Sequence, residues 1–300
     1  MVRLIVLVSL FAALSGSVGA ADSLPDAQAA EPDQGRNFLW RAMGSNGTEV
    51  FLLGSIHALP EDAYPLAVEI DEAFASAHSV YFEVDMEDTS ALGGRMMAVG
   101  ALPPEKRLSD VLDSETRDLL EAYLEKSGLS FGTVEAMKPW MAALVLTSIE
   151  LMKAGFSADA GLDLHLAGRA HQEGKEVGAF ETADYQIALF SEMDEDSSRA
   201  FLRYSLKDMD NVVSQLESLT EAWKRGNVAE LSVLLTESFS DEPELFERLV
   251  TVRNLAWLPR VEELLKGDAT AMVVVGALHL VGPGGLIEML RDQGYRVEQL

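Results

Sequence analysis

One pattern occurs twice in this 300-residue chain, once near each end. Residues 50–57 (VFLLGSIH) and 272–279 (MVVVGALH) each run through four apolar residues, a glycine, a small residue, an aliphatic residue and a histidine. A proline-marked turn, a helix with apolar periodicity and a further strand follow each copy. The sequence therefore predicts a repeated β–GxxH–α–β unit, whose histidines leave the ends of two buried strands.

The two repeated histidines, His57 and His279, are the first candidates for a functional site. Open α/β sheets place their ligands beyond the carboxyl ends of the strands, and a glycine there permits a close approach of the backbone. With 23 glycines and five histidines, a GxxH match arises by chance roughly 0.4 times, so two copies in matching contexts favour a site over a structural role. His78, His165 and His171 lack this context and are predicted to be structural.

Glu83 is the carboxylate that best complements these histidines. It lies in the strand pattern of residues 80–85 (VYFEVD), where alternation places it on one face with Asp85, a weaker second choice. A carboxylate inside an apolar strand is costly to bury unless it meets a cation or a donor, and an edge strand with a solvated acidic face is the alternative. Two imidazoles and a carboxylate form a site suited to a divalent transition ion such as Mn, Co or Zn.

The order of the predicted elements indicates an α/β (α+β) fold with a central mixed β-sheet. Short runs rich in β-branched and aromatic residues predict strands at 37–43, 48–54, 79–84, 176–180, 271–277 and 295–299. Apolar spacing of three and four residues predicts helices at about 61–77, 114–126, 134–154, 159–173, 183–193, 196–224, 227–238, 242–265 and 284–292. Because the strands cluster at the two ends of the sequence, the sheet must be built from both ends around a mostly helical insertion of about residues 100–265.

The amino terminus has the features of a secretory signal. One basic residue, an apolar run that is short for a bilayer crossing, and the small residues of 17–21 (SVGAA) predict a signal peptide over residues 1–20. A retained anchoring helix is the alternative. The acidic, proline-containing residues 21–35 predict a flexible leader, and residues 36–300 the folded domain. Since no later apolar run reaches 18 residues, we expect a periplasmic or secreted protein without stable membrane insertion after signal cleavage.

Composition excludes several classes of function. The 49 acidic residues outnumber the 23 lysines and arginines, and the net charge of −26 repels nucleic-acid backbones and anionic membranes. The absence of cysteine removes disulfides, thiolate nucleophiles, Cys-ligated zinc and iron–sulfur clusters. The chain also lacks HExxH, GxSxG and GxxxxGK(S/T), so it carries no motif of a zincin, a serine hydrolase or a P-loop protein.

The motifs resemble those of the TraB/GumN family. The resemblance is carried by GSIHAL and VYFEVD near the start, GKEVGAFET in the middle and VVVGALHLVGPGGL near the end, and it spans roughly residues 37–300. The motifs are also similar to those of the animal TIKI proteins, secreted or membrane-tethered enzymes described as metal-dependent proteases. The resemblance implies His57, His279 and Glu83 as the metal site, the same three residues that the strand pattern selects.

The resemblance implies further site residues. Glu181 matches a glutamate after the middle strand, where it would act as a ligand or proton acceptor, or simply cap the following helix. Arg253 and Asn254 match an Arg-Asn pair before the second GxxH. Arg253 would orient a carboxylate, bind a peptide C-terminus or a developing oxyanion, or form an ordinary surface ion pair. Asp163 in GLDLHL matches another family position, although an acidic residue early in a helix needs no functional explanation.

Together these features predict an exported metal-dependent hydrolase, and the resemblance implies that it is a peptidase. The metal ion would activate a water molecule, with Glu83 or Glu181 carrying the proton. The alternative is a non-catalytic periplasmic protein that binds a peptide or another small ligand with the same fold. The hydrolase prediction requires His57, His279 and a carboxylate to converge within reach of one ion. The substrate, the identity of the metal and the oligomeric state are not encoded in any motif.

Overall fold

The computed structural model of the chain describes residues 36–60, 63–85, 89–237, 239 and 243–300. The predicted signal peptide and leader, residues 1–35, lie outside this described part. Among the described residues, none of the helices combines the length and the apolar character that a bilayer crossing requires.

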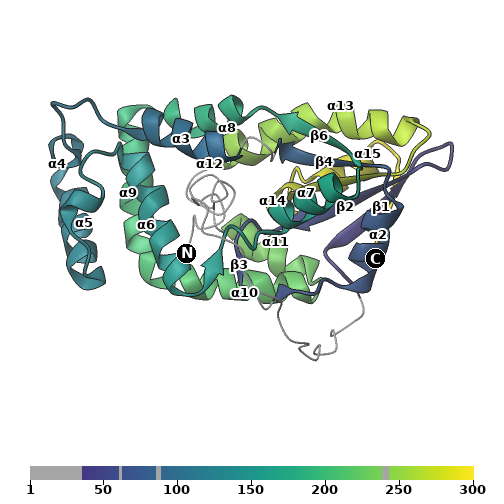
Figure 1. Cartoon of the computed structure of the whole chain (residues 1–300), viewed down its shortest axis with the longest axis horizontal. Helices are drawn as coiled ribbons and strands as arrows, with labels where there is room; N and C mark the ends of the chain where they lie inside the picture. Colours follow the sequence, from purple (N-terminus) through teal and green to yellow (C-terminus); the bar gives the residue numbers. More distant parts are fainter. Residues whose placement is uncertain (1–35, 61–62, 86–88, 238, 240–242) are drawn as a thin grey trace.

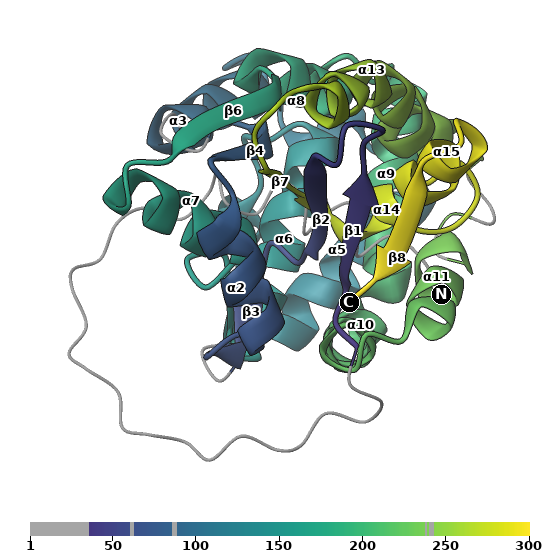
Figure 2. The same ribbon diagram turned by 90° about the vertical axis from the view of Figure 1, so that its right-hand side faces the viewer.

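A six-stranded mixed sheet forms the centre of the fold (Figure 2). Its strands have the order β6-β4-β7-β2-β1-β8, with bounds Glu176–Glu181, Ser79–Val84, Ala271–Gly276, Glu49–Ser55, Leu39–Met43 and Arg296–Gln299. Strands β6, β4, β7 and β2 are parallel, whereas β1 pairs antiparallel with both β2 and β8. The mixed α/β fold and all six predicted strands are confirmed. Two very short strands that the pattern does not indicate, β3 (Leu59–Pro60) and β5 (Phe156–Ser157), pair separately.

The two strands of the repeated motif are neighbours in the sheet. β2 and β7 pair in parallel, from Val50 opposite Ala271 to Ser55 opposite Gly276. Both strands are almost entirely buried, as continuous apolar runs predict for strands that are covered on two faces. The two ends of the chain therefore meet in the sheet, and both GxxH histidines leave it at the same edge.

Strand β4, which carries Glu83, is an interior strand between β6 and β7. Its neighbours Val80 and Phe82 are buried, and Glu83 is buried as well. This position rules out the alternative of an edge strand with a solvated acidic face. A carboxylate at such a place needs a cation or hydrogen-bond donors to offset its lost hydration.

Helices cover both faces of the sheet and build a helical layer beside it (Figure 1). Helix α7 packs against β4 and β6, whereas α13 and α15 lie on the opposite face, against β2 and β8 (Figure 2). The helices are α2 (Val68–Ser76), α3 (Thr89–Gly100), α4 (Leu108–Val111), α5 (Ser114–Ser127), α6 (Pro139–Lys153), α7 (Leu162–Gln172), α8 (Ala183–Ser191), α9 (Glu195–Asp208), α10 (Val212–Lys224), α11 (Val228–Glu237), α12 (Pro243–Phe246), α13 (Val252–Lys266), α14 (Ala277–Leu280) and α15 (Leu286–Asp292). Short 3₁₀ turns lie at η4 (Phe131–Thr133) and η5 (Met209–Asn211), and a π-helical turn lies at η6 (Glu247–Thr251).

The predicted helix boundaries need correction in the insertion. The helix predicted over 196–224 is two helices, α9 and α10, separated by η5. The apolar spacing continues across this break through the buried Met209 and Val212, so periodicity alone does not reveal it. The segment 242–265 likewise divides into α12, η6 and α13, and the helices α3 and α4 are not indicated by the sequence pattern.

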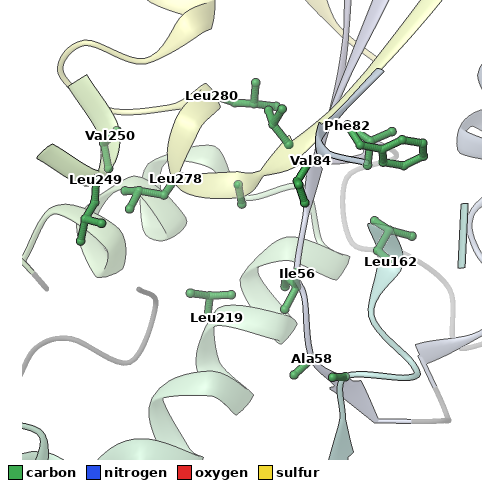
Figure 3. Close-up of a cluster of buried hydrophobic side chains, with 14 of the residues drawn as sticks. Ile56, Ala58, Phe82, Val84, Leu162, Leu219, Leu249, Val250, Leu278 and Leu280 are labelled. Carbon is green, nitrogen blue, oxygen red and sulfur yellow. The ribbon is translucent and has the colours of Figure 1, made fainter. Parts of the chain in front are cut away.

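Apolar side chains enclose the edge of the sheet at which the motif histidines emerge (Figure 3). They come from the segment after β2, from β4, α7, α10, η6 and α14, and include Ile56, Ala58, Phe82, Val84, Leu162, Leu219, Leu249, Val250, Leu278 and Leu280. All of them are buried. Polar groups in this surrounding are shielded from water, so their mutual interactions are stronger than at the surface.

Candidate functional site

The three residues predicted as metal ligands converge at the carboxyl edge of the parallel strands. His57 follows β2, Glu83 lies near the end of β4, and His279 lies in the short helix α14 after β7. The Nε2 atoms of both imidazoles lie 3.8 Å from the same atom, Oε1 of Glu83. None of the three side chains is more than 7% exposed. The convergence that the hydrolase prediction requires is therefore present.

Glu83 is held as an ionised carboxylate by donors on both of its oxygens. The backbone N–H of Gly276 donates to Oε1 at 2.7 Å, and Nη2 of Arg253 donates to Oε2 at 2.5 Å. Burial opposes the charge of Glu83, but Arg253, the two histidines and the Gly276 hydrogen bond together outweigh it, so the pKa of Glu83 lies well below its ordinary value. Glu83 thus offers a negative oxygen to the two histidines.

His279 is held as a neutral imidazole. Its Nδ1 lies 2.7 Å from Oδ1 of Asn254, whose amide nitrogen donates to the carbonyl oxygens of His279 and Gly284 at 3.1 and 2.8 Å. The amide orientation assigns the proton of His279 to Nδ1 and leaves a lone pair on Nε2. Burial and the nearby charge of Arg253 lower the pKa of His279 to about 3. A neutral imidazole with a fixed tautomer is the form that binds metals.

His57 is supported from behind by Asp163, at the start of α7. Its Nδ1 lies 2.8 Å from Oδ2 of Asp163, outside hydrogen-bond alignment, and neither ring nitrogen has a hydrogen-bond partner among the described residues. Burial lowers the pKa of His57, but Asp163 outweighs this effect, so the net shift is upward. Helix α7 is fixed there because the N–H of Leu162 donates to the carbonyl of Ile56, and a side chain at Gly161 would collide with the His57 carbonyl at 2.4 Å.

Glu181, at the end of β6, is joined to the site through Arg253. The guanidinium donates from Nε and Nη2 to the two oxygens of Glu181 at 2.8 and 2.9 Å, and Trp257 adds an indole N–H at 3.0 Å. Gln186 donates to Oε2 of both Glu181 and Glu83 at 3.3 Å. Burial raises the pKa of Glu181 despite the charge of Arg253. With both oxygens accepting, Glu181 is placed to position Arg253, and its role as a proton acceptor stays a prediction.

The alternative of a surface ion pair for Arg253 is wrong, because this residue is only 3% exposed. Each of its five N–H groups has a partner. Nη1 donates to the carbonyl of Leu249 at 3.0 Å and faces Nε2 of His279 at 3.1 Å, while Nε and Nη2 serve the two glutamates. The guanidinium therefore orients carboxylates, and in this arrangement it has no donor left for a peptide C-terminus.

Arg253 and Asn254 enter the site from the first turn of α13, directly after the π-helical turn η6. Successive helical residues point about 100° apart, so one of them reaches the carboxylates while the other reaches the loop around His279. Asn254 is completely buried. Single π-helical turns occur frequently at functional sites, and here one precedes the two residues of the Arg-Asn motif.

Two residues of this network, Gln186 and Trp257, were missed by sequence reasoning. Gln186 lies in α8, whose N-cap is Thr182 rather than Glu181, so the capping alternative for Glu181 is wrong. Trp257 lies one helical turn after Arg253 and packs against His279, with ring centroids 4.4 Å apart and ring planes tilted by 44°. Neither residue belongs to a sequence motif, and only the spacing of Trp257, one helical turn after Arg253, could have indicated it.

The weaker candidates lie apart from the buried triad. Asp85 is exposed. His78 precedes β4 and therefore lies at the amino ends of the parallel strands, opposite the triad. The ring of His165 packs against that of Tyr64, with centroids 4.5 Å apart. His171 lies in the last turn of α7. These placements agree with the structural roles that were expected for the three other histidines.

The donor set fits a divalent metal ion. Two atoms that each lie about 2.1 Å from one ion are at most ~4.2 Å apart, so the two separations of 3.8 Å from Glu83 Oε1 are within reach. The orphaned Nε2 of His57 also points to a missing partner. In the described part of the chain, however, no three acidic or histidine side chains are already arranged around one ion position. The contact between Arg253 and Nε2 of His279 has to change for both imidazoles to bind.

Comparisons with known sequences found a family model and several distant relatives. The sequence model of the TraB/PrgY/gumN family matches residues 38–299. The chain is 29% identical to the uncharacterized protein YbaP of Escherichia coli over 261 residues, which cover 86% of this chain and 95% of YbaP. It is 24% identical to metalloprotease TIKI1 of Danio rerio over 87% of this chain and 63% of TIKI1, and 25% identical to human TIKI1 over 76% and 55%. No solved structure matches the chain significantly.

Proposed function

Because the chain belongs to the TraB/PrgY/gumN family, we propose that it is a metal-dependent hydrolase that acts on peptide bonds. The observation that carries the proposal is the pair of imidazole nitrogens at 3.8 Å from one buried carboxylate oxygen. The distant similarity to proteins named metalloprotease TIKI1 supports this reaction class. A divalent ion, Mn, Co or Zn, would supply a polarised carbonyl and a water of lowered pKa.

In this proposal, His57, His279 and Glu83 hold the ion. Asp163 fixes the ring of His57 and Asn254 fixes the ring of His279, each through Nδ1, so that both Nε2 atoms face Glu83. Arg253 keeps Glu83 ionised and aimed at the histidines. Its low pKa makes Glu83 a ligand that stays deprotonated and a weak base near neutral pH.

The proposal is tested by metal analysis and peptide cleavage on the same protein samples. We expect the wild-type protein to bind stoichiometric metal and to cleave an unstructured peptide, and His57→Ala and His279→Ala to lose both properties. His165→Ala is the matched control, since this histidine is half-buried and outside the triad. Bound metal with peptide binding but no cleavage would favour the non-catalytic binding protein. A folded wild-type protein that takes up no metal would contradict the proposal.

We also propose that the protein is exported, on the evidence of the sequence pattern of residues 1–20. Cleavage after the small residues near position 20 would release residues 21–300 into the periplasm or the medium. Amino-terminal sequencing of protein from fractionated cells tests this directly. A cytoplasmic protein that retains Met1 would refute the export proposal without affecting the assignment of the site.

A further inference from the structure

Arg253 contacts two of the three residues that are proposed to hold the metal ion. Its Nη1 lies 3.1 Å from Nε2 of His279, the atom that a metal needs, and its Nη2 lies 2.5 Å from Oε2 of Glu83. Arg253 therefore contacts one histidine and the carboxylate among the proposed metal ligands. The guanidinium is thus a cation that is already bound among the metal ligands.

The position of Arg253 is strongly fixed. Glu181 accepts two of its N–H groups, and the carbonyl of Leu249 accepts another. The guanidinium also lies over the ring of Trp257, 4.8 Å from its centroid. Moving the charge away would break several buried contacts at once, so we expect it to stay near the site when a metal binds.

The charges of the site also indicate that Arg253 takes a role that a metal ion usually has. Two buried carboxylates, Glu83 and Glu181, are neutralised in part by the single charge of Arg253. In most metal sites, the ion itself compensates buried carboxylates. Here the chain carries its own cation, so the charges of the two carboxylates are partly compensated before any metal binds.

We propose that Arg253 is an internal competitor of the metal ion, which lowers the affinity of the site and allows the metal to exchange. This inference rests on the proposed function. A metal must take the lone pair of His279 from Nη1 and bind next to a fixed positive charge in surroundings of low dielectric. Removing that charge therefore strengthens metal binding, whereas a residue that only positions Glu83 would weaken binding when removed.

The test compares metal affinity in variants of the metal-free protein. Calorimetric titration with Mn²⁺, Co²⁺ and Zn²⁺ is performed on the wild type, on Arg253→Met and on Arg260→Met. Arg260 is the matched control, because it lies on the same helix α13, carries the same charge and is half exposed. We expect Arg253→Met to lower the Kd at least tenfold, and Arg260→Met to change it less than twofold.

A second variant covers the case in which Arg253→Met does not fold. The pair Arg253→Met with Glu181→Gln removes the cation and one of its two carboxylate partners, so the net charge stays at the wild-type value. We expect this pair to bind metal more tightly than the wild type, and its melting temperature to rise more on metal addition. Arg253→Lys keeps the positive charge, but one ammonium group cannot make all the contacts of the guanidinium. We therefore expect its metal affinity to lie between those of the wild type and Arg253→Met.

The outcomes separate the two proposals. Equal or weaker binding in the folded Arg253 variants, with a wild type that binds metal, overturns the competition and leaves the hydrolase proposal standing. The absence of metal binding in every variant overturns both. Tighter binding in the folded Arg253 variants than in a wild type that itself binds metal supports the competition.

Discussion

The glycines of the repeated motif have different surroundings, and alanine substitutions should separate their roles. A Cβ atom at Gly54 would lie 2.4 Å from the ring of Phe38, closer than two carbons can approach. A Cβ atom at Gly276 would lie 3.2 Å from Glu83 Oε1 and 3.3 Å from His57 Nε2, where shifts of a few tenths of an ångström relieve the crowding. Gly54→Ala therefore overpacks the core, at about 1–3 kcal/mol of unfolding free energy. Gly276→Ala crowds the site and should lower stability by less than about 1 kcal/mol.

Urea unfolding and metal titration on both variants measure this difference. We expect Gly54→Ala to lose stability but to keep its metal affinity once folded, and Gly276→Ala to lose affinity with little loss of stability. Gly94→Ala is the control for a helical glycine, since a Cβ atom there meets nothing within 4 Å. Equal stability losses at the two motif glycines, or unchanged metal affinity in Gly276→Ala, would refute the reasoning.

Three further predictions concern the groups behind the histidines. Asp163→Asn should weaken metal binding about 10–100-fold, because it removes the carboxylate that supports His57. The exposed Asp159→Asn is the control and should leave the affinity unchanged. Calorimetric metal titration measures both, and equal affinities would contradict the prediction. Asn254→Leu leaves Nδ1 of His279 and two carbonyls unpaired, so urea midpoints should report a loss of about 2–4 kcal/mol, and a loss below about 0.5 would count against the network. The pKa of His279 is lowered to about 3, so the unfolded chain binds the extra proton and His279 destabilises the fold as the pH falls below 6.5. The stability deficit of His279→Gln should therefore shrink between pH 7 and pH 5, and a constant deficit would contradict the shift.

The sequence was sufficient to locate the triad because its residues stand at strand ends. Continuous apolar runs determine β2 and β7 as buried parallel strands, and His57 and His279 follow both at the same spacing. Glu83 stands out because a charge inside an apolar strand demands a partner. Such signals are local, so one sequence reveals them.

The network around the triad could not be predicted in the same way. Gln186 and Trp257 sit on ordinary helical faces, and only the packing of α8 and α13 at the sheet brings them to the glutamates. The repeat is also imperfect at its last strand. The strand that follows each copy of the repeat carries a glutamate near its end, Glu83 in the first copy and Glu298 in the second. Glu298 pairs with Arg41 on the neighbouring β1, away from the histidines. The two glutamates match in sequence, but only Glu83 reaches the histidines.

X-ray absorption on the cobalt- or zinc-loaded protein tests the central claim most directly, because it reports the ligands of the bound ion. The account predicts two imidazoles together with carboxylate oxygen in the wild type, whereas His279→Ala, which loses stoichiometric metal, should give no such shell. An all-oxygen shell in the wild type, or an imidazole count that His279→Ala leaves unchanged, would contradict a site shared by the two GxxH motifs.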